Sequence, residues 1–489
     1  MNKLLAGMKN EGLTDNGALK YNSTLNAVYD LFARGGAMRQ ASETDVRDLF
    51  IAAYNENAEL AMKCLFYLRD ILGGQGERRF FRICLKWLAQ YHPEVAMKNM
   101  ANLVYDGFGR WDDLFVLFDT PCEDAMIQLV QAQLIKDALA LWKKDAPVSL
   151  LGKWMPSENA SSSATKALAN RFSTAFGTSA RNYRKSLAAL RAHINVVERL
   201  MSAGKWDEIQ FDKLPSRAGL QYMNAFREHC PERYAEFMAS KSTTINAGTL
   251  YPSDVVRKAR EISLDYHSRD AVNKYWANLT DYFHGMTLNA LAVVDTSGSM
   301  TCTSNSVAPI DVAIALGLYC AERAHGPFAN HFISFSRNAR LIECVGQDFV
   351  EKVDKIYEQA LCENTNLDSI FQLIFNTAIC HNLAQEDLPE YLVIISDMQI
   401  DVCSYYGQPA HIMEKWRTLF QNAGYTMPKL IWWNVNSKNP TMLDDPNASD
   451  VTYVSGCSPV IFEMVLSGKT DYDLMLDKLN SERYVGIHA

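Results

Sequence analysis

Acidic and hydroxyl side chains follow directly after two apolar runs in the second half of the chain. An alternating acid and hydroxyl pattern follows residues 288–294, a serine and an acid follow residues 391–395, and a threonine between them precedes a predicted helix. The side chains that could hold an ion are Asp295, Ser297, Ser299, Thr365 and Asp397. Their oxygens form a hard ligand set without thiolate or imidazole, which suits Mg²⁺, with Mn²⁺ as the alternative. The pattern therefore predicts a divalent-metal site.

The elements needed to position these side chains are those of a doubly wound sheet. Apolar runs of strand length alternate with helical patterns, and these runs lie at 288–294, 331–335, 391–395, 430–435 and 451–454. Such alternation is typical of a parallel sheet covered by helices. Ligands of these sheets bind beyond the carboxyl ends of the strands, where the oxygen-rich segments lie. Residues 285–470 are therefore predicted to form a Rossmann-like α/β domain.

The oxygen-rich segments do not match common hydrolytic motifs. A serine hydrolase needs a Gly-x-Ser-x-Gly elbow, which residues 295–300 lack. A phosphoaspartate enzyme would have an acid where Ser297 stands. A metal nuclease usually places several carboxylates directly on its ions, whereas this set has two carboxylates and three hydroxyls. We therefore expect the protein to bind a ligand and not to be an enzyme.

Residues 1–284 carry a helical period instead. Apolar stripes recur there, separated by turn signals such as Gly35-Gly36 and His92-Pro93. Short helices joined by short turns indicate hairpins stacked in a HEAT-like α-solenoid, although the pattern leaves open whether the solenoid closes into a ring. Residues 471–489 are predicted to be a tail that packs on the core.

Two short motifs in the helical part have alternative interpretations. The segment Gly73-Gly-Gln-Gly76 lacks the Gly-Lys-Ser/Thr of a phosphate loop, so a tight connection between helices is expected. Trp111-Asp112-Asp113 could be a paired-carboxylate site. The favoured interpretation is a helix start, because acids near a helix N-terminus meet its positive dipole end.

The two halves of the chain differ in charge. Residues 1–290 hold 36 basic and 32 acidic groups, whereas residues 291–489 hold 12 and 24, which gives the net charge of -8 for 489 residues. The most basic stretch, residues 159–197, has six basic side chains and no acid. Basic surfaces neutralise phosphates, so this stretch could contact a nucleic acid, with a merely solvated face as an equally open alternative. The candidates are Lys166, Arg171, Arg181, Tyr183 as a base-stacking ring, Arg184, Lys185 and Arg191.

Several classes of protein have no support in the sequence. The eleven Cys include no Cys-x-x-Cys pair, which fits reduced thiols and not a disulfide framework. The N-terminus lacks the apolar core of a secretory signal, and no apolar run reaches the length of a membrane span. We expect a cytoplasmic protein without a membrane partner, and the sequence does not predict the oligomeric state.

The metal-site pattern resembles the metal-ion-dependent adhesion site (MIDAS) of von Willebrand factor A domains, over roughly residues 286–470. By that resemblance, Ser297, Ser299 and Thr365 would ligate the metal. Asp295 and Asp397 would hold it directly or through water. The remaining coordination position would accept an oxygen from a partner, usually a carboxylate.

The rest of the chain resembles a family defined mainly as a domain of unknown function. The residues that carry this resemblance are 69–78, 107–114, 182–185 and 394–399. That family is similar in architecture to the Ro-like TROVE proteins, which join a ring of HEAT-like helices to a von Willebrand A domain. The resemblance implies that structured or small noncoding RNA binds on the helical part. The leading hypothesis is thus a metal-bearing RNA-binding scaffold, and the alternative is a protein-interaction module whose metal captures a partner's Asp or Glu.

Overall fold

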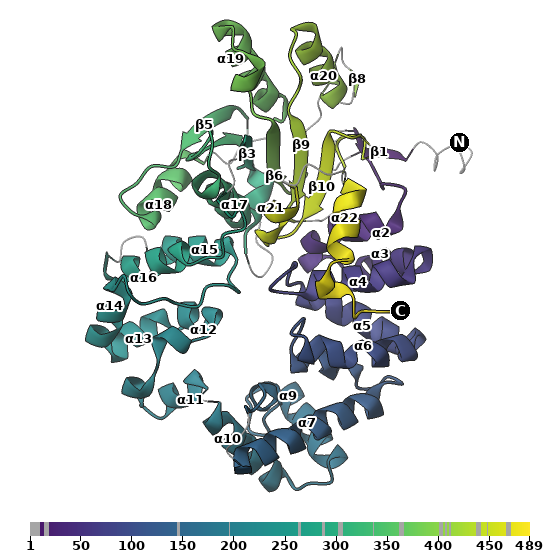
Figure 1. The fold of residues 1–489 in the computed structure, drawn as a ribbon, viewed down its shortest axis with the longest axis vertical. Coiled ribbons are helices and arrows are strands. Elements are labelled where there is room, and N and C mark those ends of the chain that lie inside the picture. Colours follow the sequence, from purple (N-terminus) through teal and green to yellow (C-terminus); the bar gives the residue numbers. More distant parts are fainter. Residues whose placement is uncertain are drawn as a thin grey trace.

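The computed structural model describes a helical ring joined to a sheet domain (Figure 1). The described residues are 10–13, 19–143, 147–194, 196–262, 266–285, 289–301, 307–335, 337–360, 366–400, 404–405, 408–409, 412–436, 442–446, 448–465 and 471–489. Two small antiparallel ribbons accompany the main elements, β1 (Glu11–Leu13) with β2 (Leu19–Tyr21) and β7 (Ser404–Tyr405) with β8 (Gln408–Pro409).

The first half of the chain is a succession of short helices. The α-helices are α2 (Ala27–Arg34), α3 (Glu43–Glu56), α4 (Ala58–Arg69), α5 (Arg78–Tyr91), α6 (Pro93–Tyr105), α7 (Glu123–Lys143), α8 (Leu151–Trp154), α9 (Ser163–Ala175), α10 (Ala180–His193), α11 (Val197–Ser202), α12 (Ser216–Gln221), α13 (Met223–His229), α14 (Pro231–Ala239), α15 (Pro252–Ile262) and α16 (Tyr266–Ala277). The 3-10 helices are η1 (Gly35–Gln40), η2 (Trp111–Leu117), η3 (Trp206–Glu208) and η4 (Phe211–Lys213). The predicted helical first half is therefore present.

Local sequence explains where these helices begin and which face they bury. Helix α5 buries Phe81, Leu85 and Leu88 at helical spacing and exposes Arg79 and Lys86. Serine side chains cap several starts, as where Ser179 accepts the backbone N–H of Asn182 before α10. Each helix therefore presents one apolar face, which it covers by packing on its neighbours.

The second half forms a six-stranded sheet in the order β10-β9-β6-β3-β4-β5. Its strands are β3 (Ala290–Asp295), β4 (His331–Phe335), β5 (Ala339–Glu343), β6 (Tyr391–Ser396), β9 (Lys429–Asn434) and β10 (Val451–Ser455). Its helices are η5 (Gly298–Thr301), α17 (Pro309–Arg323), α18 (Phe349–Gln359), α19 (Asp368–His381), η6 (Gln385–Asp387), α20 (Ile412–Asn422) and α21 (Val460–Val465). The five predicted strands are parallel, but β5 pairs antiparallel with β4, so the prediction of a wholly parallel sheet is corrected to a mixed one.

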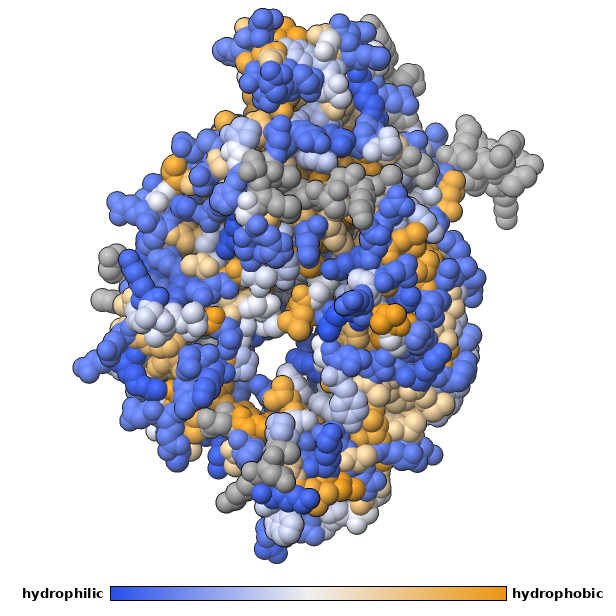
Figure 2. Space-filling model, in the orientation of Figure 1, coloured by the Kyte–Doolittle hydropathy of each residue, from blue (hydrophilic) through white to orange (hydrophobic). Residues whose placement is uncertain are grey.

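The helical array closes on itself and on the sheet domain. The Tyr251 hydroxyl, just before α15, donates to the Gln75 carbonyl on the opposite arm at 2.7 Å. Helix α15 also packs on α17, while α2 and η1 pack on β10. Figure 2 shows an opening through the middle of the resulting ring. The question of closure that the sequence left open is thus answered by contacts between residues far apart in the chain.

The C-terminal segment returns to the first helices of the ring. This segment consists of α22 (Asp471–Leu479), η7 (Glu482–Tyr484) and the last residues of the chain. In η7, the Arg483 guanidinium donates to both carboxylate oxygens of Asp70 at 2.8 and 3.0 Å. The last residue donates its N–H to Glu59, and Asn99 bonds the backbone of His488. Residues 471–489 therefore pack against α4 and α6 and tie the chain end to the helical part.

We expect Arg483→Met to lower the free energy of unfolding by about 1.5–3 kcal/mol, because it removes two charge-assisted hydrogen bonds from a buried carboxylate. Asp70 is fully buried and would keep only neutral partners such as the Tyr484 hydroxyl. Chemical denaturation of the full chain measures the effect. The neighbouring exposed acid provides the control, since Glu482→Gln should leave the unfolding midpoint unchanged. Equal stability of the two variants would contradict the importance of this ion pair.

In the part of the chain that the structure describes, no helix is long and apolar enough to cross a membrane.

Candidate functional site: a strand-end oxygen cluster and a basic helix

The register of the sheet brings the two acids of the predicted metal site together. Strands β3 and β6 are parallel neighbours, and Val294 lies opposite Ile395. Asp295 ends β3, and Asp397 follows the last residue of β6, so both residues lie at the carboxyl ends of neighbouring strands. Ser297 directly precedes η5, and Ser299 lies in its first turn. The sheet thus gathers four of the five predicted ligands.

Hydrogen bonds connect these side chains. Asp295 accepts the backbone N–H of Ser297 at 2.9 Å and the hydroxyl of Ser396 at 2.5 Å. The hydroxyls of Ser297 and Ser299 are 3.2 Å apart, and Ser299 donates to Asp397 at 3.3 Å. The result is a chain of oxygens that runs from one carboxylate to the other.

The electrostatics of this cluster favour a cation. Asp295 is fully buried, and burial followed by repulsion from Asp397 raises the pKa of its carboxyl to about 7. The residue after Asp397, Met398, has a φ of 61°, a left-handed conformation that a side chain rarely adopts. Such strain is held by surrounding structure and is typical of functional loops. Two buried carboxylates with hydroxyls between them match the oxygen-only donor set that Mg²⁺ prefers.

The fifth predicted ligand, Thr365, lies outside the described residues. Among the described residues, no group of three or more His, Cys, Asp or Glu could hold a metal, and the strand-end cluster contains only two acids. From the sequence alone, no role was assigned to Ser396, whose hydroxyl donates to Asp295. Ser396 is the last residue of β6, the strand that pairs with β3. This position was the available signal that Ser396 could orient Asp295.

Part of the predicted basic surface is available to a ligand. The exposed candidates are Lys166 on α9 and Arg181, Arg184 and Lys185 on α10. Among the described residues, none of these four side chains forms an ion pair. Arg181, Arg184 and Lys185 lie at i, i+3 and i+4, so they share one face of the helix. They form an exposed basic face on α10.

Three other candidates make intramolecular contacts, and for Tyr183 its burial overturns the predicted base stacking. Tyr183 is buried and donates its hydroxyl to the Pro156 carbonyl, so its ring cannot stack on a base. Arg171 pairs with Asp119 and Glu123. Arg191 donates to the carbonyls of Gly152 and Met155 and to a serine hydroxyl, which joins α10 to α8. Their partners lie more than twenty residues away in sequence, so the local pattern gave no signal of them.

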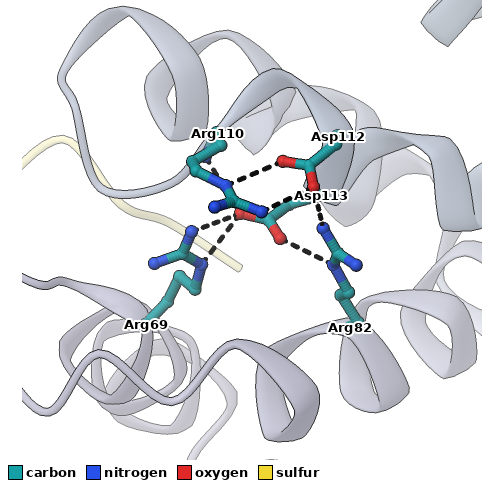
Figure 3. A network of polar contacts seen from close by, with 5 residues as sticks. All are labelled: Arg69, Arg82, Arg110, Asp112 and Asp113. Carbon is teal, nitrogen blue, oxygen red and sulfur yellow. Dashed lines mark hydrogen bonds and ion pairs between the residues drawn. The ribbon is translucent and has the colours of Figure 1, made fainter. Parts of the chain in front are cut away.

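The two short motifs in the helical part are structural. Asp113 is fully buried and forms ion pairs with Arg69 at 2.5 Å and Arg82 at 2.7 Å (Figure 3). Asp112 pairs with Arg82 and Arg110, each at 2.7 Å. In the loop between α4 and α5, the N–H groups of residues 75–77 donate to backbone carbonyls of residues 67–70. Trp111 begins η2 as expected, and the glycine loop is a tight connection without free N–H groups for a phosphate at those positions.

Comparison with known proteins divides the chain at the same place as the fold. Residues 14–128 and 162–285 match the model described as "Domain of unknown function (DUF2828)", and residues 289–483 match "Domain of unknown function (DUF7788)". Both halves resemble domains of unknown function. These matches agree with the predicted resemblance to an uncharacterised family, and neither is a match to a von Willebrand A model.

Two individual proteins are similar to the chain. "Uncharacterized protein L728" of Acanthamoeba polyphaga mimivirus is 29% identical over 508 residues, which cover 94% of this chain and 86% of that protein. The crystal structure of the Deinococcus radiodurans Ro (RSR) protein matches 94% of this chain and all of that one, at 14% identity and a TM-score of 0.35. The second likeness is too distant to bear on function.

Proposed function

We propose that this protein is a non-catalytic RNA-binding scaffold in which the helical ring contacts structured or small noncoding RNA. The observation that carries the proposal is the exposed face of α10, where Arg181, Arg184 and Lys185 form no ion pair with any described residue. Unpaired cations on one helix face are suited to neutralising phosphates. The acidic second half would repel RNA, which confines the polymer to the ring.

Binding of a structured RNA by the purified full chain tests this proposal. A filter-binding assay at increasing salt is expected to show an affinity that falls steadily on a logarithmic scale, because bound cations displace counterions from the RNA. Binding that is absent, or insensitive to salt, would contradict the proposal. The same RNA should stay intact for hours with Mg²⁺ or Mn²⁺, and its cleavage would contradict the non-catalytic part.

We also propose that the strand-end cluster holds a divalent cation, in the manner of the MIDAS of a von Willebrand A domain. Ser297, Ser299 and Thr365 would supply hydroxyl oxygens, and Asp295 and Asp397 would hold the ion directly or through water. The close approach of two carboxylates and two hydroxyls supports this proposal. A bound Mg²⁺, or Mn²⁺ in its place, would neutralise the repulsion between the two acids.

We expect Mg²⁺ to stabilise the protein through this cluster. A ligand at 100 times its Kd stabilises the folded state by about 2.7 kcal/mol, so the thermal midpoint should rise with added Mg²⁺ or Mn²⁺. Asp295→Asn keeps a similar shape but removes a charge, and it should abolish the rise. Asp387→Asn changes an exposed acid of the same domain and should respond like the wild type. If neither Mg²⁺ nor Mn²⁺ changes the thermal midpoint of the wild type, the proposed metal site is excluded.

The alternative function is a protein-interaction module in which the metal captures a carboxylate of a partner. The position of the cluster at the carboxyl ends of the strands favours this alternative, because ligands of such sheets bind just beyond those ends. Partners retained by the immobilised protein with Mg²⁺ should be released by EDTA and lost with Asp295→Ala. Retention that survives both treatments would show that the metal is not the contact.

A further inference from the structure

An arginine cluster on the ring carries more positive charge than its acids neutralise. The guanidiniums of Arg69, Arg82 and Arg110 surround the carboxylates of Asp112 and Asp113 (Figure 3). Asp113 accepts from Arg69, Arg82 and a backbone N–H, and Asp112 accepts from Arg82 and Arg110. Three cations thus share two anions, which leaves one positive charge over.

Arg78 adds a further cation to the same place. It lies four residues before Arg82 on α5, so the two side chains share a helix face. Arg78 is exposed and forms no ion pair with any described residue. Partial burial and the neighbouring guanidiniums of Arg110 and Arg82 lower the pKa of Arg78, against an opposite effect of Asp112 and Asp113, so Arg78 lies within electrostatic reach of the whole cluster. The cluster therefore has two uncompensated positive charges.

The cluster still has donors to offer. Arg82 and Arg110 use their Nε and Nη2 atoms for the aspartates, so Nη1 of each has no bond to a described residue. Both side chains are about one-third exposed, at 29% and 31%. The Arg110 guanidinium also lies over the ring of Trp154, 3.7 Å from its centroid, and this cation–π contact helps to hold it in place. Preorganised, partly exposed guanidiniums of this kind match the geometry of phosphate oxygens.

The cluster is adjacent to the basic helix. Helix α8, which carries Lys153 and Trp154, contacts both η2 and α10. Arg110, directly before η2, and the basic side chains of α5, which packs on η2, are thereby linked through one short helix to those of α10. A phosphate bound at the cluster would lie on the same part of the ring as the proposed RNA surface.

We propose that Arg78, Arg82 and Arg110 form a phosphate-binding site, filled by a phosphate of the RNA backbone. The choice of RNA as the source of the phosphate rests on the proposed function, whereas the site itself does not. Arg78 supplies a cation with no internal partner. Arg82 and Arg110 supply donors that the aspartates hold in place.

The test compares two adjacent arginines. Arg78→Gln removes one of the three cations of the site, the one that forms no ion pair with a described residue. The control, Arg79→Gln, removes the neighbouring arginine, which lies outside the cluster and donates to the Ala41 carbonyl at 2.8 Å. Pyrophosphate should raise the thermal midpoint of the wild type and of Arg79→Gln, but not that of Arg78→Gln. Arg78→Gln should also weaken RNA binding about threefold to tenfold and lower the salt slope by about 1, with Arg79→Gln unchanged.

Each arm has a distinct meaning. Loss of both responses in Arg78→Gln supports an RNA phosphate in the site. If Arg78→Gln loses only the pyrophosphate response, the site exists but binds a free phosphate compound instead of RNA. This conclusion holds even if the wild type binds no RNA. The proposal is overturned if pyrophosphate leaves the wild type unchanged, or if Arg78→Gln and Arg79→Gln respond alike.

Discussion

Replacing Arg181, Arg184 and Lys185 together by Gln is expected to weaken RNA binding at least about tenfold near physiological salt. The three side chains are exposed on one face of α10 and have no ion-pair partner among the described residues, so their loss leaves the fold intact. Each phosphate contact contributes about 0.7 to 0.9 to the slope of log affinity against log salt, so the slope should fall by about 2 to 3. Filter binding at several salt concentrations measures both quantities.

A control variant replaces three lysines elsewhere by Gln: the exposed Lys241 and Lys429 and the partly exposed Lys355. It changes the net charge as much as the α10 variant does. If RNA is held on the ring at α10, the control should bind within about twofold of the wild type. An equal loss of affinity in both variants would mean that only overall charge matters, and α10 would not be the contact.

The second large effect concerns stability. We expect Asp113→Ala to lower the free energy of unfolding by about 3–5 kcal/mol, because it leaves cations without their buried counter-charge. Asp113 is fully buried and joins three segments of the ring through Arg69, Arg82 and the backbone of Arg110. Chemical denaturation followed by circular dichroism measures the change.

The neighbouring acid is the matched control. The Asp112 side chain is 21% exposed, and it pairs with Arg82 and Arg110, which are about one-third exposed. Ion pairs that are partly open to water contribute less than fully buried ones, so Asp112→Ala should cost less than Asp113→Ala. If the two variants were equally stable, the buried network would not be what holds these helices together.

The strands and their acids could be predicted from the sequence because the signal is local. An apolar run such as residues 391–396 is buried over nearly its whole length, and the acid that follows it must lie at the sheet edge. Strand β5 lacked such a signal. It lies at the edge of the sheet, and of its residues only Ile342 is buried, so no apolar run marks it.

Features that depend on distant residues could not be predicted. Closure of the ring depends on contacts such as that between Tyr251 and Gln75, which are 176 positions apart. The roles of Arg171 and Arg191 depend on acids, carbonyls and a serine hydroxyl between 34 and 52 positions away. The basic stretch therefore marked a region with exposed cations, but the sequence could not separate the arginines that hold the fold from those that face solvent.

The most direct test of the account is to locate RNA on the protein by ultraviolet crosslinking and mass spectrometry of the crosslinked peptides. The account predicts crosslinks in the ring, concentrated in peptides from α5, α8 and α10. Crosslinks confined to the sheet domain, residues 290–465, would contradict it, as would a failure of any RNA to crosslink.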